Sequence, residues 1–219
     1  MADTTLERVR SSGIVAILTV QGAATISDVV DALVAGGVSA IEVTLRTSAG
    51  WEAIERLGSR SDVVVGAGTV LNADDARRAV DLGATFVVSP GLDPSVVDAT
   101  LRLGALPLPG IATPTELQQA LQLGLSTLKL FPAEPLGGVG MLKALAGPFA
   151  GVSFVPSGGV TPATLGNYVA QSNVVAVGCS WLVTAELVAA GRFGEIRARA
   201  KAAAATVAAV RAPHQAARD

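Results

Sequence analysis

Short apolar runs alternate along this chain with longer segments in which apolar and polar residues recur at helical spacing. The longer segments repeatedly end at a glycine, and an apolar run follows within a few residues. These glycines lie 20 to 25 residues apart, at Gly37, Gly58, Gly83, Gly104 and Gly124. Glycine is the residue that most readily closes a helix in the left-handed conformation. The pattern therefore predicts repeated units of one strand and one helix.

Eight strands and nine helices follow from this pattern. The strands are expected at residues 14–18, 39–44, 63–67, 84–88, 105–109, 127–131, 152–156 and 174–178. The helices are expected at residues 3–11, 24–35, 49–57, 73–82, 94–103, 114–123, 138–146, 162–170 and 184–210. Strands and helices that alternate at this interval form parallel sheets.

Eight such units in 219 residues predict an α/β fold, namely a (β/α)8 TIM barrel with an N-terminal helix. An open doubly wound sheet is the alternative. No linker or change in composition divides the chain, so residues 1–219 are expected to form a single barrel domain, with a frayed tail from about residue 212. The active sites of such barrels lie at the carboxyl ends of the strands. The residues that end each strand are therefore the candidates for function.

Composition supports this fold and excludes some functions. Half of the residues are hydrophobic and only 4% are aromatic, so the core must consist of Val, Leu, Ile and Ala, as in parallel strands buried on both faces. Charged residues make up 16% of the chain, and the net charge is −2. This charge indicates neither a nucleic-acid groove nor a membrane-binding patch.

The chain contains one cysteine, Cys179, and one histidine, His214. A single cysteine excludes an internal disulfide and fits a reducing compartment. The first apolar run, 14–18, is too short for a signal sequence or a membrane span, so a cytoplasmic protein is expected. One histidine cannot supply a zinc or iron centre built on several histidines, and it nearly excludes Ser-His and Cys-His nucleophile pairs. No metal site is expected.

A lysine lies in the middle of the apolar run 127–131, which is a predicted buried strand. Lys129 is one of three lysines in the chain, and the other two, Lys143 and Lys201, lie in polar-flanked helical contexts. An ammonium group without a partner is costly to bury, and buried lysines are commonly neutral. A neutral amine is the nucleophile of Schiff-base chemistry. The alternative is a lysine that extends to the end of its strand or pairs with a carboxylate.

Period-two alternation in the second predicted strand places Glu42, Thr44 and Arg46 on one face, opposite the aliphatic residues. The same alternation in the sixth strand places Lys129 and Phe131 on the inner face. Glu42 and Lys129 are therefore expected to face one cavity, where the carboxylate can transfer protons for a lysine nucleophile. The alternative is a structural salt bridge between Glu42 and either Arg46 or Lys129.

Several strand ends carry groups that suit an anionic substrate. Arg46 presents a planar donor fork that matches a carboxylate, and Thr69 offers a hydroxyl after a glycine-rich strand end. Gly158 and Gly159 follow the seventh strand, and the loop 178–181 follows the eighth. Such turns expose backbone N–H groups, and a phosphate often lies between these two loops in barrels. The alternative is a plain strand-to-helix turn at each position, with the cysteine of the last loop as a packing residue.

Seven short segments, spread over most of the chain, form a characteristic series. They are IEVTLRT at 41–47, GAGTV at 66–70, SPGL at 89–92, LKLFPAE at 128–134, ALAGPF at 144–149, SGGV at 157–160 and SWL at 180–182. With these segments the chain resembles the 2-dehydro-3-deoxy-6-phosphogluconate aldolases, which are class I, Schiff-base aldolases of the Entner–Doudoroff route. Some members also cleave 4-hydroxy-2-oxoglutarate.

The resemblance implies a (β/α)8 barrel and a homotrimer. Because the protonated imine of a Schiff-base aldolase accepts the electron pair of the broken bond, no cofactor is expected. The resemblance also implies the reversible cleavage of 2-dehydro-3-deoxy-6-phospho-D-gluconate to pyruvate and D-glyceraldehyde 3-phosphate. It further implies that Lys129 forms the Schiff base with the pyruvate carbonyl and that Glu42 is the general acid and base. The residues implied in substrate binding are Arg46 and Thr69 for the pyruvate carboxylate, Gly158, Gly159 and Ser180 for the phosphate, and Phe131 and Pro90 for the walls of the site.

The chain departs from the family pattern at two positions. Ser157 replaces the usual threonine of the phosphate loop and keeps a hydroxyl, whereas Cys179 replaces the glycine that usually precedes the serine. A side chain at Cys179 is expected to crowd the phosphate or to change its backbone contacts. The alternative functions are an aldolase for the galactonate epimer or for 4-hydroxy-2-oxoglutarate, a phosphate-binding barrel isomerase or synthase, and a non-catalytic barrel that binds phosphorylated ligands.

Overall fold

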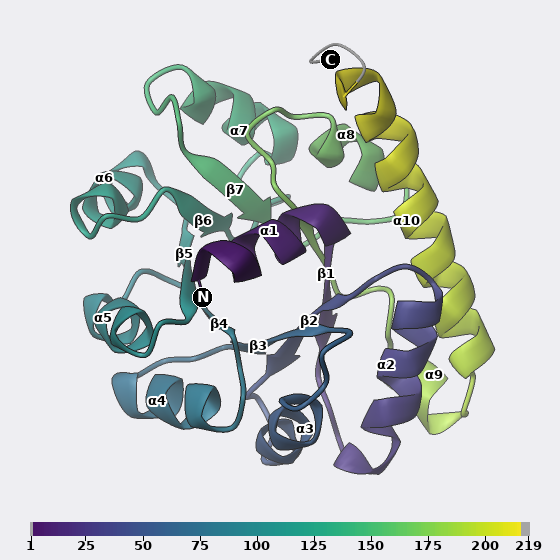
Figure 1. Ribbon diagram of the computed structural model, residues 1–219. Helices are drawn as coiled ribbons and strands as arrows, with labels where there is room; N and C mark the ends of the chain where they lie inside the picture. The colour runs from purple at the N-terminus through teal and green to yellow at the C-terminus, as the bar shows by residue number, and fades with distance from the viewer. Residues whose placement is uncertain (1, 216–219) are drawn as a thin grey trace.

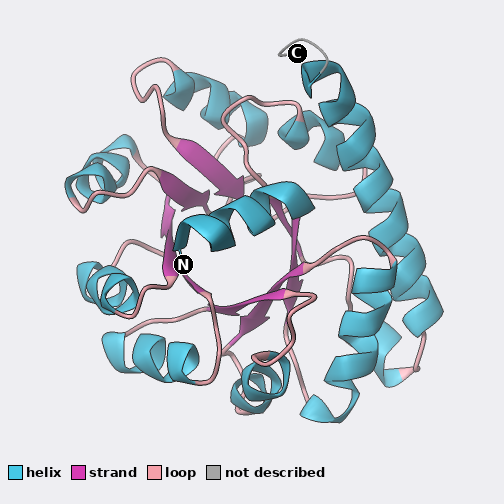
Figure 2. Ribbon diagram, in the orientation of Figure 1, coloured by secondary structure: helices cyan, strands magenta, loops and turns pink. Residues whose placement is uncertain are grey.

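The computed structural model describes residues 2–215. Eight parallel strands pair in the order β7–β6–β5–β4–β3–β2–β1–β8, and helices surround them (Figure 1). Two isolated parallel bridges join the last two strands: Phe154 of β7 pairs with Val174 before β8, and Ser157 after β7 pairs with Gly178 of β8. The strands thus form a nearly closed barrel, and the prediction of a TIM barrel rather than an open sheet is confirmed. Figure 2 shows the strands as an inner ring and, apart from the N-terminal helix α1, the helices as an outer one.

The described elements follow the predicted order. The strands are β1 Ile14–Leu18, β2 Ala40–Thr44, β3 Val64–Gly68, β4 Phe86–Ser89, β5 Leu106–Ile111, β6 Thr127–Leu130, β7 Ser153–Pro156 and β8 Val177–Cys179. The helices are α1 Ala2–Ser12, the 3-10 helix η1 Ala23–Thr25, α2 Ile26–Ala35, α3 Ala49–Leu57, α4 Ala73–Asp81, α5 Pro94–Arg102, α6 Pro114–Gln122, α7 Gly138–Ala146, α8 Leu165–Val169, α9 Ala185–Ala189 and α10 Phe193–Gln215.

The structure corrects the prediction in the last part of the chain. The single helix expected at 184–210 is two helices, α9 and α10, because Gly191 adopts a left-handed φ of +63° and ends α9. Helix α10 continues to Gln215, past the expected start of the tail, and residues 216–219 lie outside the described residues.

The eighth strand and eighth helix are also shorter than expected. The N–H of Val175 donates to Phe154 on β7, whereas the N–H of Val177 donates to Gly13 beside β1, so the chain changes partner before β8 begins. Helix α8 begins at Leu165 rather than 162, because Thr161 and Thr164 bond to each other in a separate turn.

The barrel has two apolar cores. The larger core lies between the strands and the surrounding helices and includes Ile41 and Val43 of β2 and Leu128 and Leu130 of β6. The smaller core fills the barrel interior with residues such as Phe86. Strands that are apolar on both faces and buried throughout account for a chain rich in aliphatic and poor in aromatic residues.

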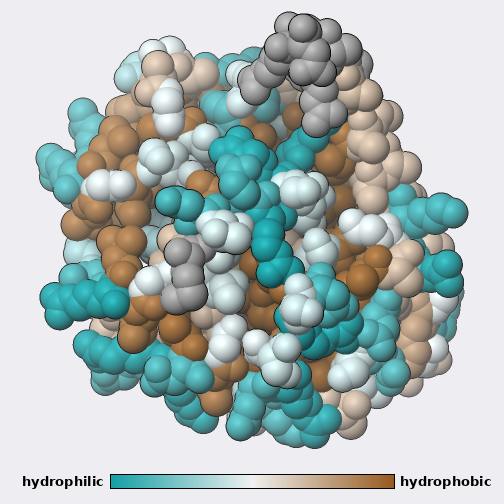
Figure 3. All heavy atoms as spheres, in the orientation of Figure 1, coloured by the Kyte–Doolittle hydropathy of each residue, from teal (hydrophilic) through white to brown (hydrophobic). Residues whose placement is uncertain are grey.

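Helix α1 closes the amino-terminal end of the barrel. It leads into β1 and lies across the opening of the strand ring (Figure 1). Val9 is completely buried in the inner core, and Leu6 packs against that core. Asp3 and Glu7 are exposed on the other side of the helix, and Figure 3 shows hydrophilic side chains over this face. The amino-terminal end is therefore sealed, and the carboxyl ends of the strands are the accessible side of the interior.

Within the described residues, no helix combines the length and hydropathy needed to cross a membrane.

Candidate active site

Lys129 and Glu42 meet inside the barrel. The Lys129 Nζ lies 3.5 Å from Glu42 Oε1, and the two side chains are only 10% and 5% exposed. Their strand neighbours Ile41 and Leu128 point outward into the helix-facing core. This is the arrangement that period-two alternation predicts for β2 and β6. Removal from water strengthens the interaction between the two groups. The Glu42 carboxylate, which can accept and donate a proton, therefore lies beside the amine.

The interior beneath this pair is apolar and nearly filled. Lys129, Glu42 and Ser157 line a cavity of about 10 Å³, together with apolar side chains such as Phe86 and Leu108. A cavity of this volume holds at most about one water molecule. The amine and the carboxylate therefore lie at the boundary between a dry interior and the accessible carboxyl ends of the strands.

Two glycines of β3 leave room for this arrangement. A Cβ at Gly68 would lie 2.2 Å from Glu42 Oε1, and a Cβ at Gly66 would lie 2.2 Å from the ring of Phe86. Real side chains do not approach so closely, so Glu42 could not keep its position beside any larger residue at 68. The glycine-rich strand end 66–68 is thus explained by the neighbouring carboxylate as well as by access for a ligand.

Arg46 and Thr69 lie together after β2 and β3, at the mouth of the barrel, which is the end where the strands have their carboxyl ends. The Nε of Arg46 donates to the Thr69 hydroxyl at 3.2 Å. Thr69 has a φ of +61° and is the one non-glycine residue with positive φ among those described. A β-branched residue in this region is strained, and such strain concentrates at functional sites. The arrangement directs a guanidinium and a hydroxyl to one place, as a carboxylate-binding site requires.

The loops after β7 and β8 lie side by side at the same end. Gly158 and Gly159 have φ values of +92° and +88°. Ser157 bridges to Gly178, where a Cβ would lie 2.0 Å from the serine Oγ. Ser180 follows β8 and is exposed. The structure therefore brings both glycine turns to the mouth, as the order of the strands predicts.

Phe131 and Pro90 border the amine. The Lys129 Nζ lies 5.0 Å from the centre of the Phe131 ring, and a Cβ at Gly158 would lie 3.2 Å from the same ring. Pro90 is exposed after β4, and its carbonyl lies over Gly110, the residue that pairs with Lys129 on the neighbouring strand. All nine candidate residues therefore lie at one end of the barrel, around a single buried lysine.

Cys179 does not point into this site, so the expectation that its side chain would crowd a phosphate is wrong. The side chain is fully buried in the core between strands and helices, where its Sγ donates to Val177 O at 3.7 Å. Burial raises the pKa of the Cys179 thiol to about 12. The thiol is an inert packing group, and the neighbouring Gly178 is the residue that faces Ser157.

Sequence reasoning did not identify Glu134 and Tyr168 as part of this region. The Tyr168 hydroxyl donates to Glu134 Oε1 at 2.7 Å, and the N–H of Glu134 donates to the carbonyl of Gly158 at 3.0 Å. The glutamate was visible only as the last letter of the motif LKLFPAE. The tyrosine carried no signal, because it lies on a helix well after the motif.

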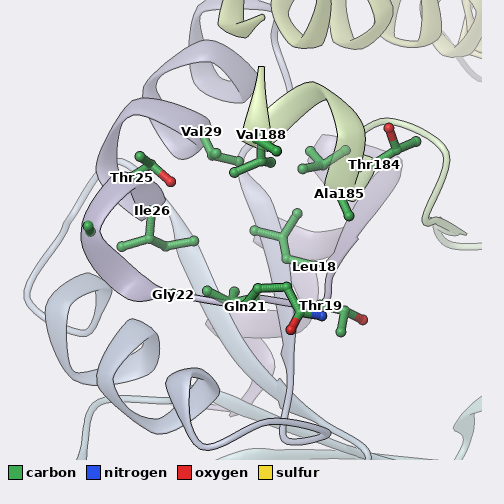
Figure 4. A pocket seen from close by; sticks show the side chains of 14 residues that line it. Leu18, Thr19, Gln21, Gly22, Thr25, Ile26, Val29, Thr184, Ala185 and Val188 are labelled. Atoms are coloured by element: carbon green, nitrogen blue, oxygen red, sulfur yellow. The ribbon is translucent and has the colours of Figure 1, made fainter. Parts of the chain in front are cut away.

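A larger cavity lies outside the barrel, between the β1–α2 connection and α9. It measures about 460 Å³, and its lining is apolar apart from Thr19, Gln21, Thr25 and Thr184. Figure 4 shows Leu18, Ile26, Val29 and Val188 around it. It contains no titratable side chain and none of the candidate residues, so its chemistry does not match that of the lysine site.

No group of three or more His, Cys, Asp or Glu side chains suited to a metal ion occurs among the residues described.

Comparison with known proteins agrees with the motifs. A family model described as KDPG and KHG aldolase matches residues 6–199. A 2-dehydro-3-deoxy-phosphogluconate aldolase of Treponema pallidum (strain Nichols) is 45% identical over 194 residues, which cover 88% of this chain and 91% of that protein.

Two solved structures are similar over most of their length. The 2-keto-3-deoxy-6-phosphogluconate aldolase of Zymomonas mobilis ZM4, solved with 3-phosphoglycerate, is 38% identical with a TM-score of 0.85 and covers 93% of this chain and 95% of that chain. The KDPG aldolase of Legionella pneumophila, with pyruvate captured at low pH as a covalent carbinolamine intermediate, is 32% identical with a TM-score of 0.87. This match covers 91% of this chain and 97% of that chain. The family expected from the motifs is confirmed, and this chain belongs to the KDPG and KHG aldolases.

Proposed function

We propose that the chain is a class I aldolase that reversibly cleaves 2-dehydro-3-deoxy-6-phospho-D-gluconate to pyruvate and D-glyceraldehyde 3-phosphate. The observation that carries this proposal is the buried pair of Lys129 Nζ and Glu42 Oε1, 3.5 Å apart at the accessible end of the barrel. The carbinolamine captured in the Legionella relative supports it, because that intermediate forms when an amine attacks the pyruvate carbonyl.

The reaction begins when the Lys129 amine attacks the C2 carbonyl of the substrate. Glu42 transfers protons to the carbinolamine oxygen, which leaves as water, and a protonated imine remains. Glu42 then takes the proton of the C4 hydroxyl, and the C3–C4 bond breaks. Its electron pair moves through C3 into the imine to form an enamine, and glyceraldehyde 3-phosphate leaves.

The second half of the cycle restores the lysine. The enamine takes a proton at C3 from Glu42, which returns to the carboxylate, and water adds to the resulting imine carbon. The carbinolamine that forms then collapses to pyruvate and free Lys129, so the water lost at the start is consumed at the end. The imine itself accepts the electron pair of the broken bond. The proposed reaction therefore requires no metal ion and no other cofactor.

Substrate binding is proposed to use the two ends of the mouth. Arg46 and Thr69, hydrogen-bonded to each other, hold the carboxylate next to the reacting carbonyl. Phe131 and Pro90 form the walls. Gly158, Gly159 and Ser180 bind the phosphate at the far end. Backbone N–H groups of the two left-handed glycines suit an anion, and the Zymomonas relative solved with 3-phosphoglycerate supports a phosphorylated three-carbon group as a ligand.

Cleavage of three substrates by wild type and Lys129→Ala tests this proposal. The three are 2-dehydro-3-deoxy-6-phosphogluconate, its galactonate epimer and 4-hydroxy-2-oxoglutarate, with pyruvate release coupled to lactate dehydrogenase. We expect the gluconate substrate to have the highest kcat/KM, and Lys129→Ala to lose activity with all three. Lys143→Ala, which changes an exposed lysine on α7, is the matched control and should retain activity.

The second candidate is an aldolase that prefers 4-hydroxy-2-oxoglutarate. The family description favours it as the alternative because it names both activities. A kcat/KM for 4-hydroxy-2-oxoglutarate above that for the phosphorylated substrate would assign this second function. Comparable activity with the galactonate epimer would show instead that the site does not discriminate at C4.

The proposal extends to assembly and location. By resemblance to the family we propose a homotrimer, which light scattering of the purified protein tests directly. A single cysteine in 219 residues supports a reducing compartment such as the cytoplasm. Fractionation of the source cells tests the location.

A further inference from the structure

A buried tyrosine lies beneath the glycine turn that follows β7. Tyr168 on α8 is 1% exposed, and its hydroxyl donates to Glu134 Oε1 at 2.7 Å. Burial and the neighbouring carboxylate both raise the pKa of Tyr168 above its ordinary value. The phenol therefore keeps its proton at neutral pH and donates its hydrogen bond to Glu134.

Glu134 connects this tyrosine to the glycine turn. Its backbone N–H donates to the carbonyl of Gly158 at 3.0 Å. Its side chain covers Gly159, where a Cβ would lie 2.6 Å from Glu134 Cβ and 2.8 Å from Cγ. The preceding N–H, of Ala133, donates to Ser157 O at 2.7 Å. Three consecutive residues of the turn are thus fixed by the segment after β6.

The two ends of the Glu134 side chain face different neighbours. The methylene stem lies against Gly159, whereas the carboxylate is turned toward the Tyr168 hydroxyl and the first residue of α7. A Cβ at Gly138 would lie 2.9 Å from the Tyr168 hydroxyl and 3.6 Å from Glu134 Oε2. The amino terminus of a helix favours a negative charge. The carboxylate therefore has two favourable partners on the side away from the turn.

This orientation matters because the turn is proposed to bind a dianion. Glu134 as a whole residue is exposed. Without a fixed partner, its carboxylate would therefore sample positions closer to Gly158 and Gly159. A negative charge next to the bound phosphate would repel it. A displaced stem would also lose its contact with Gly159.

We propose that Tyr168 is a positioning residue for recognition of the phosphate end of the substrate. It holds the Glu134 carboxylate away from the glycine turn and keeps the stem of that side chain under Gly159. The inference rests on the proposed function, in which this turn binds the phosphate. It assigns Tyr168 no contact with substrate and no part in the chemistry at Lys129.

Tyr168→Phe tests the inference, because it removes one oxygen and keeps the ring in the core. We expect KM for 2-dehydro-3-deoxy-6-phosphogluconate to rise about tenfold, with kcat little changed. KM for 4-hydroxy-2-oxoglutarate, which has no phosphate, should stay within about twofold of wild type. Inorganic phosphate should inhibit the variant about tenfold more weakly than wild type.

A double variant separates charge from shape. If the freed carboxylate repels the phosphate, Tyr168→Phe combined with Glu134→Gln should recover most of the lost affinity, since the amide carries no charge. Thr100→Val is the matched control, because it removes another buried hydroxyl, bonded to Val96 O at 2.7 Å on α5. It should lower the thermal unfolding midpoint without changing the ratio of the two KM values.

Equal changes with both substrates, a fall in kcat alone, or no change in KM would overturn the inference. Should Tyr168→Phe fail to fold, Glu134→Gln and Glu134→Ala provide the same comparison. Glu134→Gln should keep the hydrogen bond and the KM ratio, and Glu134→Ala should raise KM for the phosphorylated substrate alone.

Trapping of pyruvate on Lys129 of the wild type tells the two proposals apart. An adduct with an unchanged KM ratio contradicts only the role of Tyr168, and no adduct contradicts the proposed function.

Discussion

Lys129 Nζ lies 3.5 Å from Glu42 Oε1 inside the barrel, with both side chains almost removed from water. The two residues come from strands that are not neighbours in the sheet, since β3, β4 and β5 lie between β2 and β6. Only barrel curvature brings them together. An amine and a carboxylate that are buried this close together can exchange a proton, and replacing either one leaves the other without that partner.

Replacing Glu42 by Gln should remove the proton acceptor while keeping the size of the side chain. We expect kcat for cleavage to fall by about 10²–10⁴, the usual contribution of a general acid or base. The coupled assay for pyruvate release measures this. Glu52→Gln, at an exposed carboxylate paired with Arg56, is the control and should change kcat less than about twofold. A Glu42→Gln variant with wild-type kcat would show that another group moves the protons.

Gly68→Ala should displace Glu42 without changing either reacting residue. The added Cβ would lie 2.2 Å from Glu42 Oε1 and 2.6 Å from its Cγ, so the carboxylate must move away from Lys129. A misplacement of about 1 Å can cost about a hundredfold in rate, and we expect a loss in kcat of that order. Gly140→Ala on α7 is the control, since a Cβ there meets nothing within 4 Å. Equal kcat in the two variants would mean that the position of Glu42 is unimportant.

Thr69→Gly should separate stability from binding. Thr69 has a φ of +61°, which costs an L-residue roughly 1–2 kcal/mol, while glycine loses roughly 0.5–1 kcal/mol of chain entropy. We therefore expect the free energy of unfolding in urea to rise by about 0.5–1 kcal/mol. Loss of the hydroxyl bonded to Arg46 should raise KM about tenfold for every substrate with the 2-oxo acid group. An unchanged KM would remove Thr69 from the carboxylate site.

The thiol of Cys179 should be unreactive in the folded protein. Burial raises its pKa from 9.0 to about 12, so the thiolate is scarce at neutral pH, and a thiol reagent should label it only after unfolding. The unfolded chain loses this proton more easily than the folded one. The free energy of unfolding should therefore fall as pH rises from about 9 toward about 12. Cys179→Ala should show a shallower fall over this range, and rapid labelling of the native wild type would contradict the account.

Much of the fold could be predicted from the sequence because a barrel of parallel strands repeats one local pattern. Each strand is a short apolar run after a helix-closing glycine, and alternation in β2 and β6 was enough to place Glu42 and Lys129 on the inner faces. The break between α9 and α10 was missed because Gly191 lies within a long run of good helix formers. The start of β8 is set by the change of hydrogen-bond partner from β7 to the chain beside β1. That change depends on tertiary contacts and has no local signal in the sequence.

Parts of the site were beyond prediction for the same reason. The direction of the Cys179 side chain depends on the register of β8, and the predicted strand ended before that residue. The left-handed backbone of Thr69 has no local signal, because threonine rarely adopts it. The contact between Tyr168 and Glu134 joins a helix to a strand end far away in the sequence. Family resemblance implied a set of substrate-binding residues but did not single out Glu134 or Tyr168.

Trapping of the covalent intermediate tests the central claim most directly. Wild-type protein is incubated with pyruvate, reduced with sodium borohydride, digested and examined by mass spectrometry, with Lys129→Ala and Lys143→Ala treated in the same way. The account predicts a reduced pyruvate adduct on the peptide that contains Lys129 in the wild type and in Lys143→Ala, and no adduct in Lys129→Ala. A wild-type protein that cleaves substrate but carries no adduct on Lys129 would contradict it.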